Sequence, residues 1–308
     1  MLAAGVADDQ IAELDGDWSK LPEAERAEFE FTKKLAHAPN TVTEADLDAI
    51  GKHYKPLQVL EIAVSVAGFA STNRWTSSLN IPAEESGDFF RKKDSKEDFS
   101  TFKTPTSDKY KSAVTSLAFI KPKATTSCPP AVPVRPELES REQVEAAWKS
   151  AAERKASLPM ADVEGANWEK LLSSFPKANA GRMASIKAGM TKGKLSAKLK
   201  AELAWVAARH DRAWYALAIA KKRLADAGLS TDEIFALDAE KNALPEAEKL
   251  AVAFAKKLTV APQTITDGDI AGLRKHFKDA EVAEIVHHLG NAAFFDRVTE
   301  VARLPLDK

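Results

Sequence analysis

The chain has 308 residues, of which 44 are basic and 45 acidic, and 44% of the residues are hydrophobic. A formal net charge of −1 gives no general reason to expect nucleic acid or an anionic membrane as a partner, and no apolar run reaches the roughly 18 residues of a membrane helix. Cys128 is the only cysteine, which excludes an intrachain disulfide, and we expect a cytoplasmic protein.

Residues 1–84 recur at residues 224–307 with a constant offset of 223 and no gap. Between 21–84 and 244–307, 24 of 64 positions are identical, against roughly one in sixteen for unrelated chains. Such a repeat indicates one structural unit used twice. The matched pairs include Phe31 and Phe254, His53 and His276, Glu61 and Glu284, Arg74 and Arg297, and Pro82 and Pro305.

The apolar spacing of the first copy is helical. Thr43, with Asp46 three residues later, has the pattern of a helix N-cap. Ile62 and Val66 then share one face of the helix that follows. Residues 85–135 are charged at first and rich in proline later, which predicts a linker.

Helical patterns resume after the linker. They cover residues 141–155, 168–175, 181–190 and 196–227, and the last stretch is either one helix or two helices broken near His210-Asp211. A further helix is predicted from 280 to 302, after an N-cap pattern at Thr266 and Asp269. No stretch alternates as a strand does, so the predicted class is all-α. The parts are a partial domain over 1–84, the linker over 85–135 and a complete domain over 136–308.

Five segments of the complete domain follow one another in a specific order: Trp168–Pro176, Leu199–His210, Ala213–Ala216, Ala227–Ile234 and Ala253–Leu258. In order and spacing they resemble the alkylhydroperoxidase AhpD-like, carboxymuconolactone decarboxylase family. The resemblance covers about 160–307 as a whole domain and 1–84 as the trailing half of a second one. It implies an AhpD-like helical fold, duplicated, with the first copy incomplete.

Catalytic members of that family carry a Cys-x-x-Cys pair at the start of the active helix, a His soon after it and a Glu about three turns before it. A thiolate stabilised by the helix N-terminus and a base attacks a peroxide, and the second Cys resolves the sulfenic acid. Here the cysteine positions fall on Ala213 and Ala216, and Glu202 lies close to the position of the acid. Because alanine can neither attack nor be oxidised, we expect thiol-dependent peroxide reduction to be lost.

A base, an acid and two aromatic residues gather on about one and a half turns around position 212. One interpretation is a remodelled pocket in which His210 is a general base oriented by Asp211, with Trp214 and Tyr215 nearby. The other is a polar break between helices, with both aromatic side chains in the core. His287 is a candidate to face a pocket or an interface. Its neighbour is also a histidine, but adjacent helical side chains point apart, so no metal site and no cofactor are predicted.

These features leave three hypotheses for function. The first is a family protein whose thiol peroxidase activity has been lost. The second is a non-catalytic interaction or scaffold module. The third is a cysteine-independent, decarboxylase-type enzyme that uses His210 and Glu202. The resemblance also implies association, either as a homo-oligomer or as a pseudo-dimer of the two copies within one chain.

The first copy starts at Met1 without the helical stretch that precedes Leu224 in the second copy. Its apolar positions would then lack a covering helix, which leaves apolar area exposed at about 25 cal/mol per Å². We expect a segment upstream of Met1, another subunit or the second domain to cover them. The positions are Phe31, Leu35, Ile62 and Val66.

Overall fold

The computed structural model describes residues 14, 16–81, 131, 134–239 and 244–307. The chain separates into two units: residues 1–21 with 81–130, and residues 22–80 with 131–308. Most of the first unit, including Cys128 and most of the predicted linker, lies outside the described residues. The helices of the predicted partial domain therefore belong to the same unit as the predicted complete domain.

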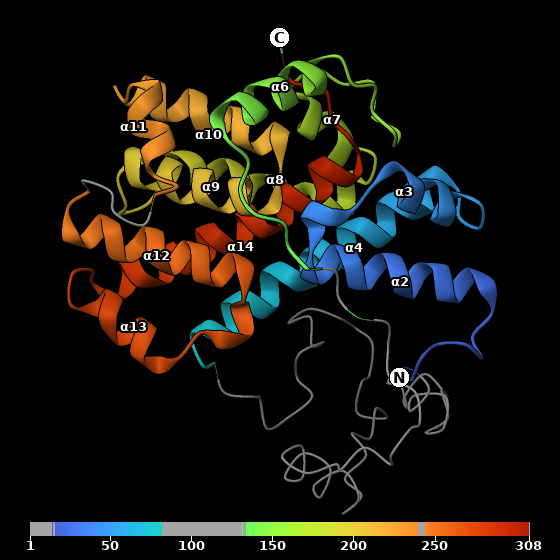
Figure 1. The fold of residues 1–308 in the computed structure, drawn as a ribbon, viewed down its shortest axis with the longest axis horizontal. Helices are drawn as coiled ribbons and strands as arrows, with labels where there is room; N and C mark the ends of the chain where they lie inside the picture. The colour runs from blue at the N-terminus through green and yellow to red at the C-terminus, as the bar shows by residue number, and fades with distance from the viewer. Residues whose placement is uncertain (1–13, 15, 82–130, 132–133, 240–243, 308) are drawn as a thin grey trace, which may run out of the picture. The chain divides into compact units, whose positions relative to one another are not determined.

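The described part of this unit contains twelve α-helices and no strand, which confirms the all-α prediction (Figure 1). The first copy supplies α2 (Glu23–His37), η2 (Pro39–Thr41), α3 (Glu44–Gly51) and α4 (Pro56–Ser78). The middle supplies α6 (Arg141–Ala152), α7 (Asn167–Leu172), α8 (Pro176–Thr191), α9 (Ala197–Asp211), α10 (Trp214–Asp226) and α11 (Thr231–Ala236). The second copy supplies α12 (Glu246–Val260), η5 (Pro262–Thr264), α13 (Asp267–Arg274) and α14 (Asp279–Val301).

The helices of the two copies begin and end at matching residues. The bounds of α2, η2, α3 and α4, shifted by 223, are those of α12, η5, α13 and α14. The local signals match as well. Asp46 accepts from the backbone N–H of Thr43 at 2.6 Å, and Asp269 accepts from that of Thr266 at 2.7 Å. These capping boxes satisfy N–H groups that an α-helix leaves without partners, so the same residues start α3 and α13.

The long helical stretch between 196 and 227 is two helices. Arg212 adopts a left-handed conformation, with φ 53° and ψ 37°, and this ends α9. The backbone N–H of Ala213 donates to the carbonyl of Ala208 at 2.9 Å, and α10 begins one residue later. The break thus follows directly after the predicted site, His210-Asp211.

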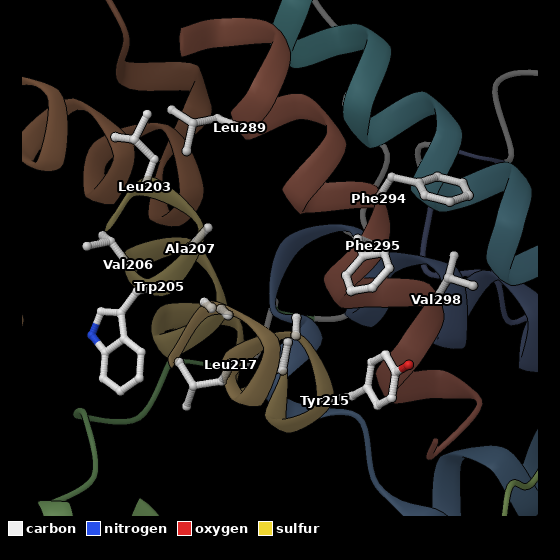
Figure 2. Packing of buried hydrophobic residues seen from close by; sticks show 14 of the residues in the cluster. Leu203, Trp205, Val206, Ala207, Tyr215, Leu217, Leu289, Phe294, Phe295 and Val298 are labelled. Atoms are coloured by element: carbon white, nitrogen blue, oxygen red, sulfur yellow. The ribbon is translucent and has the colours of Figure 1, made fainter. Parts of the chain in front are cut away.

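The long helices α4 and α14 pack along each other near the centre of the unit (Figure 1). Gly290 permits the close approach, because a Cβ added there would lie 3.2 Å from the carbonyl oxygen of Ser71. Helix α9 packs on α12 and α14, and α10 packs on α9. Their apolar side chains form one core, part of which Figure 2 shows around Leu203, Leu217 and Phe295. None of the helices in the described ranges is long and apolar enough to cross a bilayer.

Candidate functional site

Asp211, at the C-terminal end of α9, is the centre of a buried cluster of charges. Its carboxylate accepts from Arg135 Nη1 at 2.9 Å and from Arg297 Nη1 at 3.1 Å. Burial alone would raise the pKa of Asp211, but the charges of Arg297 and Arg135 outweigh it and lower the pKa. Asp211 is therefore ionised, and each of its oxygens accepts from an arginine. Among the described contacts, neither oxygen accepts from the neighbouring His210.

Arg135 is a member of this cluster that sequence reasoning missed. It falls at the end of the predicted linker, among prolines, and no local pattern marks it. In the structure its side chain is 14% exposed and also donates to the carbonyls of His210, at 2.9 Å, and His37, at 3.1 Å. Arg135 thereby joins the end of α2 to the end of α9.

The predicted catalytic pair, Glu202 and His210, does not converge. Glu202 is fully buried and its Oε1 lies 2.8 Å from Lys198 Nζ, while burial raises the pKa of its carboxyl. Burial, followed by the charge of Lys256, lowers the pKa of His210 to about 4, so its imidazole is neutral at pH 7. Eight residues separate the two on one helix, which is about 12 Å along its axis. One reacting atom cannot be in contact with both groups at that spacing.

The two positions aligned with the family's cysteines lie in the core. Ala213 is fully buried and Ala216 is 7% exposed. Ala216 lines a cavity of about 40 Å³ together with His288 and Asp296. Burial, followed by the charge of Asp211, raises the pKa of Asp296 well above its ordinary value. A cavity of that size holds one or two waters and no larger substrate.

The predicted pocket residues are spread over three places. The Tyr215 hydroxyl donates to Asp307 Oδ2 at 2.6 Å, while the Trp214 carbonyl accepts from Trp148 Nε1 at 3.2 Å. The rings of His287 and Trp75 are nearly perpendicular, with their centroids 5.7 Å apart, between α14 and α4. It is the adjacent His288 that reaches the small cavity, where its Nε2 donates to the Lys200 carbonyl at 2.8 Å. Tyr215 and His288 thus have structural partners.

The matched arginines Arg74 and Arg297 make reciprocal contacts between the copies. Arg297 of α14 donates to the carbonyls of Leu35 and Ala36, both at 3.0 Å, at the end of α2. Arg74 of α4 donates to the carbonyl of Thr259 at 3.4 Å, at the end of α12. Because Thr259 is the residue that matches Ala36, each copy contacts the other through the same pair of positions, as in a two-fold interface.

The two arginines differ in their counter-ions. Arg297 is paired with Asp211, whereas Arg74 has no carboxylate within ion-pair distance among the described residues. Arg74 is only 5% exposed, and its Nε has no hydrogen-bond partner there. Burial, followed by the charge of Arg297, lowers its pKa to about 9, so it stays charged at pH 7. In place of a carboxylate, its guanidinium donates to the carbonyls of Ala70 at 3.0 Å and Thr259 at 3.4 Å.

Arg74 lies in a groove of about 1020 Å³ between α2 and α4, and the end of α12, η5 and Arg135 also line it. The groove carries both polar and apolar side chains, and Phe69 within it is 70% exposed. Of the four positions expected to need a cover, Phe31 and Leu35 are 3% and 1% exposed and pack in the common core, which also contains residues of the second copy. Ile62 and Val66 are half-buried against that core and line the groove.

No protein-family model, no curated protein and no solved structure matches this chain. The resemblance to AhpD-like proteins therefore depends on the sequence motifs alone. Sequence reasoning expected an apolar face at Ile62 and Val66 that needs a cover, but it did not identify the buried Arg74 beside it. The signal that would have found Arg74 is its match with Arg297 in the repeat.

Proposed function

We propose that this chain is an AhpD-like, carboxymuconolactone decarboxylase-type protein that has lost thiol-dependent peroxide reduction and acts as a non-catalytic interaction module. The observation that carries the proposal is the groove between α2 and α4, with the charged and buried Arg74 in it. The loss of thiol chemistry is supported by alanine at positions 213 and 216. The third hypothesis, an enzyme using Glu202 and His210, is disfavoured by their separation along α9.

We further infer that the two copies function together as an intrachain pseudo-dimer. The support is the packing of α4 on α14 and the reciprocal contacts of Arg74 and Arg297. Among the described residues, α9 packs on α14 of the second copy, while the corresponding face of α4 lines the groove.

Two measurements test this function. In a hydroperoxide assay with a dithiol reductant, the protein should give no turnover above the protein-free rate; turnover that a thiol blocker abolishes would contradict the proposal. The second is titration with 8-anilinonaphthalene-1-sulfonate, an apolar aromatic anion suited to a groove that holds Phe69 and Arg74. It should show one saturable site per chain, removed by Phe69→Asp. The control Val163→Asp alters an apolar residue that is 44% exposed and outside the groove, and should retain the site.

A further inference from the structure

We propose that the groove between α2 and α4 binds an amphipathic helix of a partner polypeptide, parallel to α4, with a lysine near its start and an aspartate eleven residues later. This inference rests on the proposed interaction function and specifies the partner. Its template is α9, the helix that covers the equivalent face of the second copy.

In the second copy, α9 is held on α14 at three points. Lys200 Nζ lies 2.6 Å from Glu284 Oε1, and the Lys200 carbonyl accepts from His288 at 2.8 Å. At the other end, Asp211 accepts from Arg297 at 3.1 Å. Lys200 and Asp211 are eleven residues apart, about 16 Å of helix. Both helices run in the same direction, because the earlier residues of α9 meet the earlier residues of α14.

The first copy repeats these three positions on α4. Glu61 matches Glu284, Ser65 matches His288 and Arg74 matches Arg297. All three line the groove. Glu61 and Ser65 are exposed, and no ion pair joins Glu61 or Arg74 to another described residue. The groove therefore has a negative group at one end and a positive group at the other, in the register that a lysine and an aspartate on one helix would complement.

The middle of the groove is apolar, and its apolar positions on α4 match buried apolar positions on α14. Ile62, Val66 and Ala70 of α4 line it. Their counterparts on α14 are Ile285, Leu289 and Ala293, which are at most 3% exposed in the second copy. The volume of about 1020 Å³ is at the upper limit of small-molecule sites, which fits an elongated occupant such as one helix face. Burial of an apolar face between two charged ends is the helix-in-groove mode of recognition.

The middle of the groove also restricts the partner's side chains. Phe69 occupies the position that Ala292 has in the second copy, and it projects into the groove with 70% of its surface exposed. A helix lying over this ring needs small residues there. The α9 sequence has alanine at positions 201, 204, 207 and 208, so it is a suitable surrogate for the partner.

The probe is a synthetic, fluorescently labelled peptide with the sequence of residues 196–212. Its binding to the full chain is measured by fluorescence anisotropy. We expect saturable binding of one peptide per chain, weakened tenfold or more by Phe69→Asp in the protein or by Asp211→Lys in the peptide.

A charge exchange tests the pair formed by Glu61 of the protein and Lys200 of the peptide, at the exposed end of the groove. Glu61→Lys in the protein should weaken binding of the unchanged peptide, and the peptide carrying Lys200→Glu should restore it. Glu30→Lys, an exposed α2 residue outside the groove, is the matched control and should have no effect.

Three results would overturn the inference. The first is no saturable binding of the unchanged peptide. The second is binding that Glu61→Lys does not weaken or that the charge exchange does not restore. The third is a homodimer in light scattering that Glu61→Lys dissociates, since the occupant would then be a second copy of this chain. If the peptide fails while the naphthalene sulfonate still binds at Phe69, the helix proposal falls and the interaction function stands.

Discussion

Replacing Asp211 with asparagine should lower the free energy of unfolding by about 3–5 kcal/mol, the usual effect of removing one partner of a buried ion pair. Two charge-assisted hydrogen bonds depend on this carboxylate, at 2.9 and 3.1 Å. Without its charge, the fully buried Arg297 and the 14% exposed Arg135 lose their common counter-ion. Asparagine has nearly the same shape, so the loss measures the charge and its hydrogen bonds rather than a cavity.

Urea unfolding followed by circular dichroism at 222 nm measures this loss. With a slope of about 3 kcal/mol per M, the midpoint should fall by roughly 1–1.7 M. Asp226→Asn, which removes an exposed ion pair with Lys222 on α10, is the matched control and should change stability by less than about 0.5 kcal/mol. Because the folded-state pKa of Asp211 is lowered, its contribution is complete above the ordinary value of 3.8 and is lost as the pH falls below it. A variant as stable as the parent chain at pH 7 would refute the role assigned to the cluster.

Three further changes test other parts of the structure. Gly290→Ala should destabilise the protein by about 1–3 kcal/mol in urea, because its Cβ would lie 3.2 Å from Ser71 O, whereas Gly68→Ala on α4 has no atom within 4 Å and should be neutral or stabilising. His288 has a folded-state pKa of about 4 against an ordinary 6.5, so the unfolded chain binds its proton first and stability should fall from pH 6.5 to pH 4. His288→Gln should flatten that decline, while the exposed His276→Gln should leave it unchanged; equal slopes in all three proteins would contradict this. Thr266→Ala removes the hydroxyl that bonds Asp269 at 2.7 Å and should lower the thermal midpoint by an amount equivalent to about 1 kcal/mol, and a midpoint equal to the parent's would show that the cap is dispensable.

Local signals in the sequence determined the class and most of the helices. The spacing of apolar residues, the threonine caps and the constant offset of the repeat depend on neighbours within a few residues or on the chain's own second copy. For this reason the bounds of α14 were predicted to within one residue, 280–302 against 279–301. Where a local choice was open, as at the break near His210, the left-handed Arg212 resolved it in favour of two helices.

Tertiary packing determined which residues contact the candidate site residues. A short motif such as His210-Asp211 specifies which side chains are close along the chain. It does not specify which distant residues bind those side chains. Asp211 is bound by Arg135 and Arg297, 76 and 86 residues away, and both arginines come from segments that no local pattern connects to it. For the same reason the sequence indicated the apolar face at Ile62 and Val66 but not the groove around it. The walls of the groove come from α2, α4 and the end of α12 with η5, which no local pattern in the sequence brings together. Only their packing forms the groove around Arg74, which has no carboxylate within ion-pair distance among the described residues, whereas Arg297 pairs with Asp211.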